Sequence, residues 1–396
     1  MVLIKRSKNS DGISMVDSSR FWRLLPAFLL LFGNSCSTDL AENSESEVNG
    51  KVRHEGVLTS SHIDLSLSSD PFALCSTEQS QKAVFETLFL SNDSYRIPGN
   101  PNKESLHSFY DDLQKGYFSK NNTLNSPLIQ KGYHTFTHAI DVLATTHALL
   151  ECGGSRFLKD FEQTALLIAA IAHDALHLGV NNQYLINIKH PLVKEFGEDS
   201  LQEKRSIDYL LKLIKKHHLF TQSDTSNPEE NNQIKRSLKL INEAILYTDF
   251  KRHNELMDRM NTKMPSILKV IQADSEQHIN LSSSLDKDTR TLIASFILHT
   301  SDVSNPGKKW PICERWANLV MAEFFGQGDL EKSLGMKPSM NCDRDSVLIP
   351  ECQLGFGKYV VHDLYVSLAE IIPEGGNFLL KNLDANRDHW EAMRKK

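Results

Sequence analysis

Several features that would define a specialised class of protein are missing from this sequence of 396 residues. Its six cysteines form no C-x-x-C pair, which excludes a structural zinc knot or a thioredoxin-type motif, and we expect free thiols. It has no long run of acidic or basic residues and a formal net charge of -6, so we expect no nucleic-acid partner. No apolar run reaches the roughly 20 residues that a membrane-spanning helix needs.

Alternation of apolar and polar residues, the pattern of a half-buried strand, is also missing over any length that could build a sheet. Apolar residues instead recur at helical spacing, which predicts an all-α fold, a compact multi-helix bundle. An α-hairpin is expected over residues 84–113, with its turn at Pro98-Gly99, and polar loops over 221–233 and 340–351. The other expected helices are 157–176, 201–216, 234–247, 256–271, 292–301, 310–327 and 355–372.

The first 36 residues carry the pattern of a targeting or membrane-anchor segment. Basic residues precede the apolar run 24–32, and small residues and Cys36 follow it. An export signal starting at Met15, with Cys36 as a lipidation site, is one interpretation; an organelle presequence, an interfacial anchor and a chance apolar segment are the others. We expect membrane association or export through this segment, and a cytoplasmic protein otherwise. Residues 37–70 are rich in Ser, Glu, Asn and Asp, which predicts a disordered polar linker.

Two histidine pairs share a spacing of four residues: His134 with His138, and His173 with His177. On an α-helix this spacing places both imidazoles on one face, one turn apart. A single pair arises easily by chance and is then a surface or core feature without a metal. The repetition of the spacing, with Asp174 beside His173, favours a shared site.

Two apolar segments lead directly into polar residues of this kind. Residues 165–172 are nearly all apolar and end at His173 and Asp174, and residues 291–298 are followed closely by Asp302. Because an unpaired buried charge is strongly unfavourable, these groups need partners inside the fold. A divalent cation is the partner that imidazole and carboxylate donors satisfy most readily.

The number of donors suggests two cations. As a hypothesis, one ion is held by His138, His173, Asp174 and Asp302, and Asp174 bridges to a second ion completed mainly by water. Such a pair suits phosphate ester hydrolysis, because each cation lowers the pKa of a shared water and together they offset charge on the phosphoryl oxygens. His134 then remains as a proton donor.

The order of these motifs resembles that of the class I 3′,5′-cyclic nucleotide phosphodiesterases. The resemblance extends from about residue 75 to 394 and implies a catalytic domain over residues 71–396 that opens a cyclic nucleotide to its 5′-monophosphate. It rests on Tyr133-His134 with His138, His173-Asp174 with His177, Gly179 and Asn182, Thr248-Asp249, residues 299–306, Trp316, Glu323-Phe324-Phe325, Gln327-Gly328-Asp329 and residues 353–356.

For the reacting centre, the resemblance implies a tightly held Zn²⁺ and a second ion, Mg²⁺ or Mn²⁺, bridged by Asp174. It implies that His134 is the general acid that protonates the departing O3′, and that Glu203 supports it. His177 is implied to hold metal-bound water and to face the phosphate. The implied zinc ligands are His138, His173, Asp174 and Asp302.

For the nucleotide, the resemblance implies that the Gln353 amide pairs with the base edge and that Phe356 stacks on the base, with Val320 against its opposite face. The remaining pocket positions are Tyr133, Phe250 and Asn305. Because Asn305 resembles the cyclic-AMP-selective branches, we expect cAMP to be favoured, with cGMP as the other substrate. The oligomeric state is not indicated by the sequence.

The chain departs from the family pattern around the metal ligands. Thr135 stands where the family has Asn, Leu176 where it has Asp, and residues 204–206 are Lys-Arg-Ser where it has histidines. Loss of such outer partners typically costs roughly 10 to 100-fold in affinity or activity. Two alternatives therefore stay open: a catalytically weak cyclic-nucleotide-binding protein, and another His-Asp metal phosphohydrolase acting on a nucleoside triphosphate or an alarmone.

Overall fold

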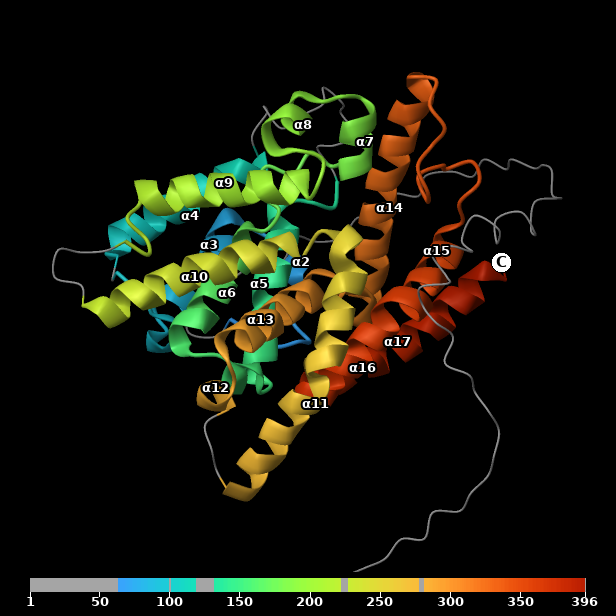
Figure 1. The fold of residues 1–396 in the computed structure, drawn as a ribbon. Helices are drawn as coiled ribbons and strands as arrows, with labels where there is room; N and C mark the ends of the chain where they lie inside the picture. The colour runs from blue at the N-terminus through green and yellow to red at the C-terminus, as the bar shows by residue number, and fades with distance from the viewer. Residues whose placement is uncertain (1–62, 100, 119–131, 222–226, 278–280, 396) are drawn as a thin grey trace, which may run out of the picture. The chain divides into compact units, whose positions relative to one another are not determined.

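Helices make up the regular structure of the described part of the chain, residues 63–99, 101–118, 132–221, 227–277 and 281–395 (Figure 1). In this computed structural model these ranges contain no β-strand, which confirms the all-α prediction. The α-helices are α2 (Pro71–Leu74), α3 (Glu78–Phe89), α4 (Lys103–Phe118), α5 (Phe136–Glu151), α6 (Asp160–Ala172), α7 (Asn182–Asn187), α8 (Pro191–Phe196), α9 (Leu201–Lys216), α10 (Pro228–Leu246), α11 (His253–Gln277), α12 (Leu281–Ser284), α13 (Lys287–Asp302), α14 (Trp310–Ser333), α15 (Ile349–Phe356), α16 (His362–Ile371) and α17 (Pro373–Arg394).

Helices α5, α6, α10 and α13 pack on one another at the centre of the described region (Figure 1). Helix α6 is buried on all sides from Phe161 to Ala172, and α13 from Thr289 to Ser301. A helix that is apolar all round belongs in the interior of a protein. The polar residues at the C-terminal ends of α6 and α13 are consequently delivered into the interior.

The histidine pairs do not lie on single helices, contrary to the simplest interpretation of their spacing. Helix α5 begins at Phe136 after Thr135 as N-cap, so His134 precedes the helix that carries His138. The helix expected over 157–176 is shorter, because α6 ends at Ala172 with His173 as its C-cap. His177 therefore lies in the turn that follows, where Leu176 has a positive φ of 67°.

The C-terminal helices show the largest difference from the sequence prediction. The helix expected over 355–372 is divided into α15, a π-helical turn (Gly357–Val361) and α16. Helix α17, which packs along α16 and α15, was not predicted. A Cβ atom at Gly376 would lie 2.3 Å from the backbone nitrogen of Ala369, so this glycine is required for the close approach of α17 to α16. Glycine in the first turn of a helix weakens the sequence signal for that helix.

The predicted targeting segment, residues 1–36, and the predicted linker up to residue 62 lie outside the described residues. Within the described ranges, no helix combines the length with the apolar character that crossing a bilayer requires.

Candidate active site

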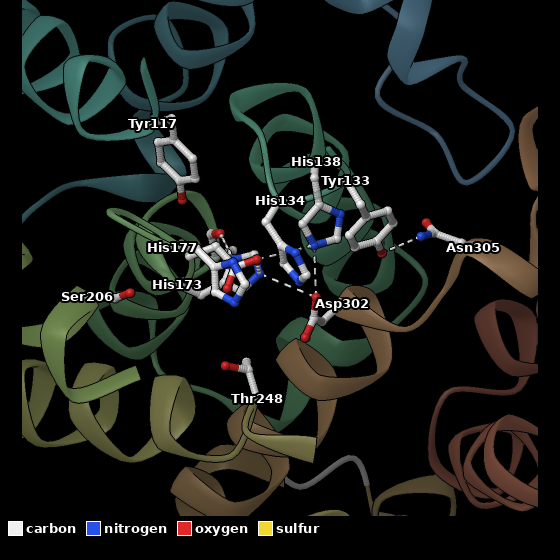
Figure 2. Close-up of polar contacts among 12 residues, drawn as sticks. Tyr117, Tyr133, His134, His138, His173, His177, Ser206, Thr248, Asp302 and Asn305 are labelled. Atoms are coloured by element: carbon white, nitrogen blue, oxygen red, sulfur yellow. Dashed lines mark hydrogen bonds and ion pairs between the residues drawn. The ribbon is translucent and has the colours of Figure 1, made fainter. Parts of the chain in front are cut away.

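Four predicted metal ligands come together from three separate segments (Figure 2). His138 lies in the first turn of α5, His173 and Asp174 follow the end of α6, and Asp302 is the last residue of α13. Each side chain offers a ligand atom within 4.8 Å of the others, and both histidines are buried. The three buried helices thus hold four donors around a common point.

The hydrogen bonds and contacts of these donors fit a shared divalent cation. Nδ1 of His173 is 2.8 Å from the carbonyl oxygen of Ala170, a contact in which the ring N–H donates and which turns Nε2 toward the carboxylates. Nε2 of His173 is buried without a hydrogen-bond partner, yet it lies 3.1 Å from Oδ2 of Asp174 and 3.3 Å from Oδ1 of Asp302. Nε2 of His138 is 2.9 Å from the same Asp302 oxygen. Imidazole nitrogens and carboxylate oxygens that point at one another in this way are typical of zinc sites.

The electrostatics of the cluster keep both carboxylates ionised. Burial alone would raise the pKa of Asp302, but the charge of His173 and the hydrogen bond from His138 outweigh burial and hold the pKa below its ordinary value. The pKa of Asp174 is lowered against its own burial, chiefly by His173. Two anionic carboxylates and two imidazoles in a buried site form a donor set that could hold a divalent cation.

A buried carboxylate on α14 holds His134 beside this cluster. Glu323 contacts Nδ1 of His134, and its Oε2 accepts the backbone N–H groups of Tyr133 at 2.6 Å and His134 at 3.2 Å. Burial lowers the pKa of His134, but the charge of Glu323 outweighs it and raises the pKa to about 9. The ring is therefore protonated at neutral pH, and its Nδ1–H group is hydrogen-bonded to Glu323.

The carboxylate that contacts His134 is Glu323, whereas Glu203, expected to support the site, binds another side chain. Glu203 lies in the first turn of α9, where its Oε2 accepts a hydrogen bond of 2.9 Å from the Asn182 amide. Burial and the nearby charge of Asp249 raise the pKa of Glu203 to about 8. A signal for Glu323 was present in the sequence, because it belongs to one of the motifs that carry the family resemblance and is buried on α14 with Ile312 and Trp316.

His177 lies beside His134, and its ring is neutral where that of His134 is protonated. Its ring stacks on that of His134, with centroids 3.8 Å apart and 29° between the planes. Nδ1 of His177 accepts the backbone N–H of Gly179 at 3.0 Å. Burial and the positive charge of His134 lower the pKa of His177 to about 4. The site consequently pairs a charged imidazole with a neutral one.

The predicted nucleotide-binding residues form two groups. In the first, the Asn305 amide donates to the Tyr133 hydroxyl, and Val320 packs against the cluster of Tyr133 and Trp316. In the second, the rings of Phe250 and Phe356 lie 6.1 Å apart between centroids. Gln353 precedes Phe356 by three residues on α15, so both lie on one side of that helix. Figure 2 shows the Tyr133–Asn305 contact next to His138 and Asp302.

Comparison with known proteins identifies the family. The family model described as 3′,5′-cyclic nucleotide phosphodiesterase matches residues 133–383, a range that contains both histidine pairs, Asp302, Glu323 and α15. The chain therefore belongs to the 3′,5′-cyclic nucleotide phosphodiesterase family.

Two curated animal proteins illustrate the similarity. A "3′,5′-cyclic-AMP phosphodiesterase 4C" of Rattus norvegicus is 30% identical over 268 residues, which cover 66% of this chain and 47% of the relative. A "3′,5′-cyclic-AMP phosphodiesterase, isoform F" of Drosophila melanogaster is 29% identical over 262 residues, 66% of this chain and 38% of the relative. The chain thus matches less than half the length of these two relatives.

A solved structure has the same fold. The phosphodiesterase domain of a rhodopsin–phosphodiesterase fusion protein from the choanoflagellate Salpingoeca rosetta matches with a TM-score of 0.68 and 24% identity. The match covers 84% of this chain and 95% of that domain.

Proposed function

We propose that this protein hydrolyses a 3′,5′-cyclic nucleotide, with cAMP preferred, to the nucleoside 5′-monophosphate. One observation carries the proposal: the four-donor cluster lies beside a histidine that a buried carboxylate keeps protonated. Membership of the family and the names of the rat and fly relatives support the same reaction.

The cluster His138, His173, Asp174 and Asp302 would hold Zn²⁺, and Asp174 would be shared with a second ion, Mg²⁺ or Mn²⁺. Cations bound in such a site activate water and polarise the phosphoryl group. The protein itself contributes the fixed geometry of the donors, because α5, α6 and α13 are anchored in the core and do not need to rearrange when substrate arrives.

His134 would supply the proton for the leaving group. Water adds to phosphorus and loses a proton to solvent, the P–O3′ bond breaks, and the proton on Nε2 of His134 passes to O3′ of the ribose, after which the ring takes up a proton from solvent. Glu323 holds the ring by Nδ1 and so leaves Nε2 for the substrate. The neutral ring of His177, stacked on His134, places no second positive charge beside the protonated ring.

Asn305 supports a preference for adenine. Its Nδ2 donates to the Tyr133 hydroxyl, while its Oδ1 is buried without a hydrogen-bond partner. An unpaired buried acceptor favours a ligand with a donor, and adenine presents its N6 amino group where guanine presents the acceptor O6. Gln353 would pair with the base edge, and Phe356 would stack on the base, with Phe250 beside it and Val320 on the opposite face.

The decisive experiment incubates the purified full chain and Mg²⁺ with cAMP or cGMP and separates the products chromatographically. We expect the 5′-monophosphate from both and faster turnover of cAMP at low concentration. Protein that contains zinc yet gives no product from either nucleotide would refute hydrolysis and favour the cyclic-nucleotide-binding alternative. Faster release of phosphate from a nucleoside triphosphate would instead favour another metal phosphohydrolase.

Membrane association or export through residues 1–36 is proposed on the sequence pattern alone. We expect the full chain to fractionate with membranes or outside the cytoplasm, and a variant lacking residues 1–36 to stay in the cytoplasmic fraction. The same distribution for both forms would refute a targeting role for this segment.

A further inference from the structure

Three side chains on one face of α9 reach the turn that carries Asp174 and His177. Gln202, Arg205 and Ser206 are spaced so that they project from neighbouring positions of one helical face. We define the catalytic turn as residues 173–180. Ser206 lies on the same side of the histidine cluster as His173 and His177 (Figure 2).

Two of these side chains bind backbone carbonyl groups of the catalytic turn. The Ser206 hydroxyl donates to the oxygen of Ala175 at 2.8 Å, and Nη1 of Arg205 donates to the oxygen of Leu176 at 2.7 Å. A hydrogen bond from a charged donor is stronger than most neutral ones. Arg205 therefore makes a strong attachment between α9 and the residue that directly precedes His177.

Gln202 makes two hydrogen bonds to the second half of the catalytic turn, one through the oxygen and one through the nitrogen of its side-chain amide. Its Oε1 accepts the backbone N–H of Leu178 at 3.0 Å, and its Nε2 donates to the oxygen of Val180 at 2.8 Å. These two bonds fix which way the amide faces, so its nitrogen lies toward the His177 ring, 3.2 Å from Nε2. Gln202 is itself buried, so water does not compete for these bonds.

The catalytic turn needs such support because its backbone is strained. Leu176 has a φ of 67°, a left-handed conformation that is unfavourable for a residue with a β-carbon. Its N–H donates to the oxygen of Gly116 on α4 at 3.2 Å, and its carbonyl oxygen accepts from Arg205. The strained residue is thus held from both sides.

The same contacts connect two departures from the family pattern. Position 176 is Leu instead of Asp, and residues 204–206 lack the family histidines. Because Arg205 touches the carbonyl of Leu176, these two substituted regions are neighbours in the fold. In this chain, position 176 carries no carboxylate, and the side chains of Arg205 and Ser206 donate to backbone carbonyl groups of the same turn.

We infer that Gln202, Arg205 and Ser206 are positioning residues, which hold Asp174 and His177 in their working geometry in place of the family's Asp and histidines. The inference rests on the proposed function for its kinetic consequences, but not for its structural ones. It explains how the chain can keep an active arrangement without the family's partners at these positions.

The first test compares R205M, which removes the donors, with R205K, which keeps one charged donor, and with Q202L. Hydrogen exchange is measured for the amides of residues 173–180, along with zinc content, kcat and KM for cAMP. We expect R205M and Q202L to exchange at least tenfold faster in this turn and to lose roughly 10 to 100-fold in kcat, with KM within about twofold and zinc retained. R205K should recover most of both losses. The control K212M removes another basic residue of α9, paired with Asp208 at the surface, and should behave as wild type.

The second test restores the family residues together. R205H alone should lose activity and protection of the turn, and L176D with R205H should recover part of both, because neighbouring substitutions are not additive. Wild-type exchange and kcat in R205M and Q202L would overturn the inference, as would strict additivity of L176D and R205H. If wild type itself turned over no cyclic nucleotide, the proposed function would fail, and the exchange data would still decide the positioning role.

Discussion

The metal cluster and the nucleotide-binding residues belong to one site but are built in different ways. The metal ligands are anchored by α5, α6 and α13, and His138 and His173 are 0% and 1% exposed. Of the side chains proposed to bind the base, Phe250 comes from a three-residue 3-10 turn and is 38% exposed. On this proposal, the first half is organised before substrate binds, whereas the second gains packing from the nucleotide. Substitutions should accordingly damage chemistry and stability in the first half and binding in the second.

The largest effect is expected for Asp302→Ala. Removing this carboxylate leaves His138 and His173 without a shared buried partner, a loss of about 3–5 kcal/mol in the free energy of unfolding. Zinc content and turnover should fall together to background. Both are measured on the purified variant beside Asp388→Ala, an exposed carboxylate whose removal should change neither. Retained zinc with normal turnover would show that Asp302 is not a ligand.

A smaller effect, confined to chemistry, is expected for His134→Ala. Loss of a general acid lowers kcat by roughly 10²–10⁴-fold, while the four donors that would hold zinc are untouched. Steady-state kinetics and metal analysis on one preparation test this. Loss of zinc from the variant would show that His134 contributes to metal binding.

In the nucleotide half, Phe356→Ala should act mainly on KM. Stacking of a base on an aromatic ring is worth about 1–3 kcal/mol, so we expect KM for cAMP to rise about tenfold or more, with kcat within a few fold. Phe118→Ala, which removes an exposed ring elsewhere, is the matched control. A fall in kcat with unchanged KM would show that Phe356 affects the chemical step and not nucleotide binding, contrary to the proposed division of the site into two halves.

The smallest effect at neutral pH is expected for Glu323→Gln, and it should depend on pH. Against the effect of burial, Glu323, together with the charges of Asp174 and Asp302, raises the pKa of His134 from an ordinary 6.5 to about 9, so wild type should keep its proton donor until the pH approaches 9. In the variant, the alkaline limb of the kcat profile should move to lower pH. The ion pair stabilises the fold fully below about 6.5, and this stabilisation is lost as the pH rises through about 9. Identical pH profiles for the two proteins would show that Glu323 does not tune His134.

The residues that could be placed from the sequence are those whose neighbours in the chain are strongly apolar. Residues 165–172 and 291–298 indicated buried helices, and the structure puts His173 and Asp302 at their ends. Side chains whose role depends on a distant partner were harder to place. Glu323 meets His134 across 189 residues, and no local pattern connects the two. The stacking of His134 on His177 likewise depends on two turns that lie outside the helices.

The amino-acid sequence by itself determined that the chain is helical, that imidazole and carboxylate donors follow buried segments, and which family it resembles, because hydrophobic periodicity and motif order are properties of neighbouring residues. Only the tertiary structure decided that Glu323 rather than Glu203 contacts His134, that His177 is neutral beside a charged ring, and that α9 supports the catalytic turn. These features arise from packing between segments far apart in the chain, where burial and a few ångströms of separation set the charge of each group.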